Sequence, residues 1–159
     1  MVTTDEIWSL LEDVNDPEVP VLSVVDLGIV REIRTEGEEI EIVITPTYSG
    51  CPAMDVIRMN IRMKLREQGY PNLKLTTVLS PAWTTDWLTD TARAKLLELG
   101  IAPPEPGQGT EALFGRPAVP CPRCGSRNTE RISAFGSTAC KALHRCLDCR
   151  EPFEAFKCH

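Results

Sequence analysis

The sequence predicts an α+β protein in which a front domain of order α-β-β-α-β-α precedes a linker and a small C-terminal metal module. Three observations support this fold class. In the first hundred residues, some segments repeat apolar residues at helical spacing and others alternate apolar with polar residues. Proline and glycine are concentrated in residues 103–119, and six of the seven cysteines follow that stretch. We therefore place the front domain at residues 1–102 and the module at residues 120–159.

The first predicted element is a short amphipathic helix. Thr3 and Glu6 have the spacing of a capping box, in which each side chain accepts the backbone N–H of the other residue. Apolar residues then recur at intervals of three and four through Val14. Because Asp16-Pro17-Glu18 follows, we expect the helix to end before this segment.

A β-hairpin and a second helix come next. Residues 28–34 and 39–45 alternate apolar and polar side chains on either side of Gly37, which is typical of two strands joined by a turn. Pro52 suits the first position of a helix, and an apolar stripe continues from it until Gly69. The sequence therefore predicts a helix between these two residues.

A third strand and a third helix complete the front domain. Residues 73–79 carry the strand pattern, and Thr84 or Thr85 can cap a helix that Gly100 ends. Residues 103–119 contain too many prolines and glycines to sustain a helix or an interior strand. We interpret them as a linker.

The C-terminal module carries a predicted four-thiolate metal site. Cys121 and Cys124 form one C-x-x-C pair, and Cys146 and Cys149 form a second. Each pair directs two thiolates at one ion, so that the two pairs supply the tetrahedral ligand set of a structural zinc ribbon. Four thiolates leave no open position for a catalytic zinc. Rubredoxin-like iron or an iron–sulfur cluster uses the same ligands, and the spacing leaves this choice open.

Other potential ligands lie outside the two pairs, namely Cys51, Cys140, Cys158, His144 and His159. Cys51 is expected at or beside the N-terminus of the second helix, where the helix dipole stabilises a thiolate. An ordinary buried cysteine is the alternative. The tail residues form either a second metal site, a small buried residue with a frayed terminus, or a disulfide. Residues 1–119 contain no histidine, which excludes a Cys–His catalytic pair within the front domain.

Charge and hydropathy bear on the partners and the compartment. Residues 120–159 hold seven Lys/Arg and four Asp/Glu, against ten and nineteen in the rest of the chain. The acidic front domain argues against nucleic-acid binding. No apolar run approaches the length of a membrane span, and the N-terminus lacks the features of a signal peptide. We therefore expect a cytoplasmic protein that binds neither nucleic acid nor membrane.

Four segments of the front domain match a known family. They are Asp16-Pro17-Glu18, residues 25–30 with Asp26, residues 45–52 with Cys51, and residues 80–83 with Trp83. In this combination they resemble the MIP18 family, whose members act in cytosolic iron–sulfur protein assembly and related metal-site maturation. With tail segments 135–142 and 151–159, the resemblance extends to the branch of that family that serves the bacterial phenylacetyl-CoA epoxidase.

The resemblance implies a MIP18-like domain with a C-terminal zinc ribbon, acting as an accessory factor in phenylacetate catabolism. Such a factor would assist assembly of the iron–sulfur or di-iron site of the epoxidase, with its oxygenase or reductase subunits as partners. The resemblance also implies that Cys51 is the reactive cysteine and raises the expected importance of Cys140 and Cys158 in holding transient iron or an iron–sulfur cluster.

The residues themselves agree with an accessory role. The chain has no Glu-x-x-His pair of the kind that builds a di-iron site and no dinucleotide-binding glycine fingerprint, so we do not expect an enzyme. A non-catalytic structural or adaptor subunit remains an alternative. A thiol enzyme acting on a CoA thioester through Cys51 is the weakest one, since no base is evident nearby. An exposed edge of the three-stranded sheet leaves a homodimer open.

Overall fold

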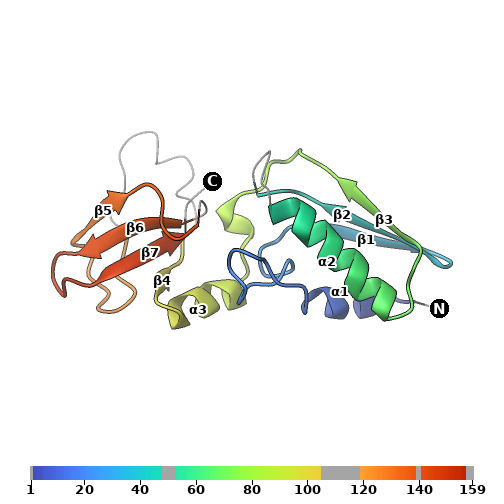
Figure 1. The fold of residues 1–159 in the computed structure, drawn as a ribbon, viewed down its shortest axis with the longest axis horizontal. Coiled ribbons are helices and arrows are strands. Elements are labelled where there is room, and N and C mark those ends of the chain that lie inside the picture. The colour runs from blue at the N-terminus through green and yellow to red at the C-terminus, as the bar shows by residue number, and fades with distance from the viewer. Residues whose placement is uncertain (1, 48–52, 105–118, 139–140, 157–159) are drawn as a thin grey trace. The chain divides into compact units, whose positions relative to one another are not determined.

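The computed structural model describes residues 2–47, 53–104, 119–138 and 141–156 (Figure 1). The chain divides into two compact units, Met1–Trp83 and Thr84–His159. Each unit combines helix and sheet, so the predicted α+β class is confirmed. No helix among the described residues has the length and apolar character needed to cross a membrane.

The first unit contains two helices and a three-stranded sheet of order β1-β2-β3 (Figure 1). Its elements are α1 (Thr4–Leu11), β1 (Val30–Glu36), β2 (Glu39–Ile44), α2 (Ala53–Glu67) and β3 (Leu73–Thr77). The predicted hairpin is present as the antiparallel pair β1 and β2, and β3 runs parallel to β2. The first five predicted elements thus occur in the predicted order.

The core of the first unit is formed where the apolar faces of α1 and α2 meet the sheet. The capping box of α1 is present, because the Thr3 hydroxyl accepts the Glu6 N–H and the Glu6 carboxylate accepts the Thr3 N–H. Helix α2 buries Ile57, Ile61 and Leu65 completely or almost so. Helix α1 packs against α2 and β1, and α2 also contacts β3. Burial of this continuous apolar face stabilises the unit.

The second unit holds a four-stranded sheet of order β4-β7-β6-β5. Its elements are η1 (Thr85–Trp87), α3 (Asp90–Glu98), β4 (Ile101–Ala102), β5 (Thr129–Ser133), β6 (Lys141–Cys146) and β7 (Pro152–Phe156). Strands β5, β6 and β7 are antiparallel neighbours, whereas β4 pairs with β7 in parallel. The three antiparallel strands form the ribbon expected for the C-terminal module.

The third helix begins later than the sequence predicts. Its N-cap is Thr89, whose hydroxyl accepts the Ala92 N–H at 3.1 Å. The hydroxyl of Thr84 instead accepts the Asp86 N–H at the start of the separate 3₁₀ turn η1. Three threonines here have the chemistry of a helix cap, and the extended backbone of Thr89 selects that residue. The helix ends at the predicted place, before Gly100, whose φ is +73°.

The segment between Trp83 and the linker belongs with the tail in the structure, whereas the sequence places it in the front domain. Ile101 pairs with Glu154 and Ala102 with Ala155, so that β4 is an edge strand of the ribbon sheet. Ala102 is 1 % exposed, and its burial draws the preceding residues into the second unit. Of the predicted linker 103–119, residues 105–118 lie outside the described residues.

Candidate metal centre

Two backbone turns of the same kind present the four paired cysteines. In the first turn the Cys121 N–H donates to the Ser126 carbonyl at 2.8 Å, and in the second the Cys146 N–H donates to the Glu151 carbonyl at 3.0 Å. Each turn has a left-handed residue directly after its second cysteine. These residues are Gly125 (φ +76°) and Arg150 (φ +65°). The two turns therefore repeat one local geometry around a shared centre.

The four sulfurs lie close enough to hold one ion. The Sγ atoms of Cys121, Cys124, Cys146 and Cys149 all lie within 4.8 Å of one another. Across the two turns, Cys121 and Cys149 are 3.7 Å apart and Cys124 and Cys146 are 3.6 Å apart. Metal–sulfur bonds of about 2.3 Å in a tetrahedron require sulfur–sulfur distances of about 3.8 Å. The donor set thus fits a tetrahedral ion bound by four thiolates.

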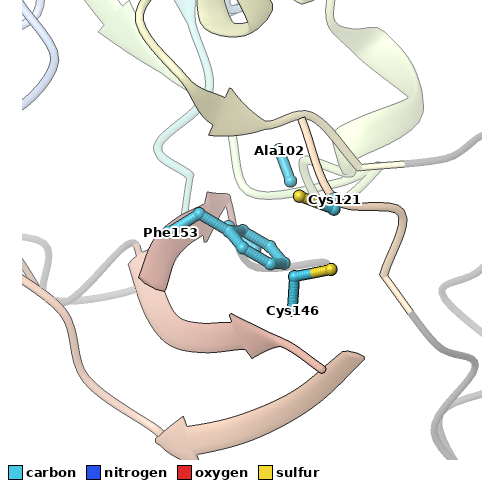
Figure 2. Close-up of a cluster of buried hydrophobic side chains, with 5 residues drawn as sticks. Ala102, Cys121, Cys146 and Phe153 are labelled. Carbon is cyan, nitrogen blue, oxygen red and sulfur yellow. The ribbon is translucent and has the colours of Figure 1, made fainter. Parts of the chain in front are cut away.

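Two of the four cysteines also form the core of the module. Cys121 is 2 % exposed and Cys146 is fully buried, and they pack with Ala102, Phe153 and Ala155 (Figure 2). Figure 2 shows the Phe153 ring beside both cysteines, with Ala102 on the strand above. A core of this size contributes little hydrophobic free energy. The metal site and the core of the module therefore overlap, and metal binding should supply much of the folding free energy.

Polar contacts join the two turns around the sulfurs. The Asp148 carboxylate accepts hydrogen bonds from the Ser126 hydroxyl and, at 3.0 Å, from the Asn128 side-chain amide. Arg123 and Glu151 form an ion pair at 2.7 Å. Each contact links one turn to the other, so they help to hold the turns in register. The ion pair is well exposed, and we assign it a contribution of at most about 1 kcal/mol.

The thiols of the cluster differ in acidity. Backbone N–H groups of Cys149 and Asp148 stabilise the Cys146 thiolate and lower the pKa of that thiol to about 7. The N–H of Glu151 favours ionisation of Cys149, but burial and the neighbouring sulfurs together raise its pKa to about 12. A metal ion must therefore displace protons from this cluster when it binds.

Of the further predicted ligands, the structure describes only His144. It lies on β6, where strand alternation places it on the same face as Cys146. Its ring stacks on Phe153 with the ring centroids 5.5 Å apart and an angle of 17° between the planes. Because Phe153 also packs against Cys146, one aromatic ring joins this histidine to the cysteine cluster. Cys51, Cys140, Cys158 and His159 lie outside the described residues, and the second site stays a prediction.

Three acidic or aromatic residues of the front-domain segments make structural contacts. The Asp16 carboxylate accepts the N–H groups of Glu18 and Val19 at 2.7 and 2.8 Å, which closes the turn after α1. Asp26 and Ser23 cap each other's backbone N–H. The Trp83 indole N–H donates to the Leu27 carbonyl. Pro17 follows Asp16 on the exposed side of its turn.

Sequence reasoning did not single out Glu154 as a residue that organises the loop before β6. The Glu154 carboxylate accepts the Ser137 N–H at 2.7 Å and the Ser137 hydroxyl, and it lies 3.8 Å from the Lys141 ammonium. Lys141 is 7 % exposed, so its charge is buried beside this carboxylate. The only available signal was the position of Ser137 and Lys141 within segment 135–142.

Comparisons with known proteins match both parts of the chain. Residues 4–78 match the family model described as "Iron-sulfur cluster assembly protein", and residues 105–157 match the "PaaD zinc beta ribbon domain". A putative subunit of the 1,2-phenylacetyl-CoA epoxidase of Escherichia coli K12 is 52% identical over 153 residues, which cover 96% of this chain and 92% of that protein.

Two further relatives match the front of the chain. An Fe-S protein maturation auxiliary factor from Porphyromonas gingivalis is 33% identical over 101 residues, covering 62% of this chain and 92% of that protein. The solved structure of a conserved hypothetical protein from Thermotoga maritima aligns with a TM-score of 0.52 at 26% identity, covering 60% of this chain and 94% of that one.

Proposed function

The chain belongs to the MIP18 family of iron–sulfur cluster assembly proteins, and we propose that it is an accessory maturation factor for the multicomponent phenylacetyl-CoA epoxidase. In this role it assists assembly of the iron–sulfur or di-iron site of that enzyme during phenylacetate catabolism in the cytoplasm. It carries out no catalytic step of its own. Its partners are the oxygenase subunits, the reductase subunit, or both.

One observation carries the proposal, namely that a single chain joins an assembly domain to a ribbon. The match to the Fe-S maturation auxiliary factor is confined to about the front two thirds of this chain, yet it covers almost all of that protein. The match to the epoxidase subunit continues through the ribbon. The front domain therefore supports a maturation activity, and the ribbon supports its dedication to the epoxidase.

The four paired cysteines hold a structural zinc ion in this proposal. Cys121, Cys124, Cys146 and Cys149 supply four thiolates at tetrahedral spacing and leave no coordination position for a substrate. Zinc has no redox chemistry, so the ion can maintain the fold of the ribbon without reacting with iron that the protein handles.

The remaining thiols handle the cargo, which is iron or an iron–sulfur cluster. Cys51 is the principal ligand, and Cys140, Cys158, His144 and His159 are candidates to complete a transient site. Cysteine thiolates and imidazoles are suitable ligands for iron, and none of these residues is needed by the zinc ion. A transient site with few protein ligands is appropriate for a metal that must be passed on.

An adaptor that only joins epoxidase subunits is the second candidate function. It is favoured by the solvent-exposed faces of the two units, and it requires no metal beyond zinc. The two functions differ in what they require of Cys51, because an adaptor does not use this thiol.

Anaerobic reconstitution with ferrous iron and sulfide tests the proposal. We expect visible cluster absorption in the native chain and its loss in Cys51→Ser, with about one zinc ion per chain retained in both. The double variant Cys51→Ser, Ser9→Cys is the matched control, since it keeps the number of thiols but places one on the exposed face of α1. Full cluster absorption in Cys51→Ser, together with restored epoxidase activity in cells lacking the gene, would support the adaptor instead.

A further inference from the structure

A hollow of about 480 Å³ lies on the first unit between the outer face of α2 and the segment that leads into β3. We refer to it as the α2 groove. The residues used in the argument below are Arg58, Met59, Arg62, Met63, Arg66 and Tyr70, all of which line it. This groove is separate from the cysteines of the metal centre, and neither the fold nor the proposed cluster chemistry accounts for it.

Helical spacing arranges the groove into two parallel rows. Arg58, Arg62 and Arg66 are four residues apart and therefore share one side of α2. Met59 and Met63 are also four residues apart and form the neighbouring row. These methionines are 53 % and 52 % exposed, although the opposite face of the same helix is completely buried. A basic row thus runs beside an apolar row on the exposed side of α2.

The positive charge of this groove is largely uncompensated within the unit. Arg58 is held in place by Asp55 at 3.1 Å and by the Thr77 hydroxyl at 2.9 Å. Neither Arg62 nor Arg66 forms an ion pair with any residue that the structure describes. Residues 1–119 as a whole have nineteen acidic and ten basic residues. The groove is therefore a basic row on an acidic protein.

Tyr70 marks the end of the basic row. It lines both the α2 groove and a second hollow that contains Asp5 and Glu6. The sign of the charge therefore reverses across one aromatic side chain. A partner that follows the groove would place its carboxylates on the arginine side of Tyr70 only.

This combination of side chains has the chemistry of a protein-binding surface. Arginine, methionine and tyrosine are enriched at the centres of protein interfaces. Guanidinium groups bind carboxylates through paired hydrogen bonds, and methionine adapts its shape to apolar side chains. The acidity of the surrounding domain disfavours nucleic acid, and a small anion would make no use of the methionine row.

We propose that the α2 groove docks an amphipathic segment of an epoxidase subunit, in which carboxylates spaced to meet Arg62 and Arg66 flank apolar side chains that cover Met59 and Met63. The identity of the partner rests on the proposed function, whereas the chemistry of the docked segment rests on the groove. The arginine row provides steering and register, and the methionine row provides the apolar area that is buried.

Binding of the full, zinc-loaded chain to purified oxygenase and reductase components tests the proposal. We expect Arg62→Glu to weaken binding by roughly ten-fold or more, because it reverses one charge of an interfacial pair. The matched control is Arg31→Glu, which makes the same charge change on β1 outside the groove and should leave binding nearly unchanged. Met59→Ala with Met63→Ala should weaken binding with little change in its salt dependence. Unaltered thermal unfolding and zinc content identify variants that remain folded.

A second probe separates the groove from the identity of the partner. It is a synthetic amphipathic helix with Glu at every fourth residue beside a Leu row, compared with the same peptide carrying Gln. Equal binding of a subunit by native chain and Arg62→Glu would overturn the groove and leave the proposed function standing. Arg62-dependent binding of the Glu peptide without any binding of the subunits would uphold the groove and refute the proposed partner. Absence of binding to both probes would overturn both.

Discussion

The indole nitrogen of Trp83 lies 2.7 Å from the carbonyl oxygen of Leu27 and donates a hydrogen bond to it. The two residues are fifty-six positions apart and belong to two of the segments through which the chain resembles its family. Trp83 is 4 % exposed and Leu27 is 2 % exposed, so the bond is shielded from water. It therefore joins the last residue of the first unit to the loop between α1 and β1.

Replacing Trp83 with Phe should destabilise the first unit by about 2 kcal/mol, because the buried Leu27 carbonyl loses its donor. Urea unfolding followed by circular dichroism measures this change. Trp8→Phe is the matched control, since Trp8 lies half-buried on α1 and should cost less. Equal losses in the two variants would show that the indole N–H has no special role.

Removal of the metal should unfold the ribbon and leave the first unit folded. The ribbon core is small and includes Cys121 and Cys146, whereas the first unit has its own core of larger side chains. Cys146→Ser should destabilise the ribbon more than Cys124→Ser, since both lose a ligand but only the first places a hydroxyl in the core. Limited proteolysis and zinc analysis, with and without chelator, measure these effects. A ribbon that resists proteolysis after chelation would contradict the expected dependence on metal.

The left-handed backbone after each cysteine pair gives a prediction of opposite sign at two positions. Gly125→Ala should weaken zinc retention by about 1 kcal/mol, because an L-residue at positive φ is strained. A Cβ at this position would meet no atom within 4 Å, so the cost is conformational and not steric. Arg150→Gly removes the same strain from the second turn and should strengthen or preserve zinc retention. Competition with a chromophoric chelator measures both, and a loss in the second variant equal to that in the first would contradict the strain argument.

Thr45 provides a fourth prediction, because its buried hydroxyl has no hydrogen-bond partner in the part of the chain that the structure describes. Thr45→Val should stabilise the first unit by about 1 kcal/mol, since the methyl group carries no desolvation cost. Thr45 directly follows β2 and precedes the segment that contains Cys51. Thermal unfolding measures the stability, and a destabilised variant would indicate that the hydroxyl does bind a polar group.

Features with a local cause could be predicted from the sequence. The α1 capping box requires only Thr3 and Glu6, and the C-x-x-C spacing brings together each pair of cysteines. The hairpin follows from alternation around Gly37. In each case the residues that determine the structure are near neighbours in the chain.

Features with a distant cause could not be predicted. Pairing of Ala102 with Ala155 depends on a strand more than fifty residues away, and two residues carry no periodic pattern. The same holds for the contact between His144 and Phe153, which depends on the register of β6 and β7. The α2 groove was missed because its arginines and methionines have the spacing of an ordinary exposed helix face.

The edge strand β4 changes what the proline-rich segment can do. Ala102 precedes that segment and Val119 and Cys121 follow it, yet all three belong to the same buried cluster. The two ends of the segment are therefore fastened to one body, and its length cannot set the reach of the ribbon from the rest of that body. A protease cut between them would leave two fragments that stay associated. An autonomous ribbon should accordingly be expressed from about residue 84, since a fragment beginning after the segment would lack one strand of its own sheet.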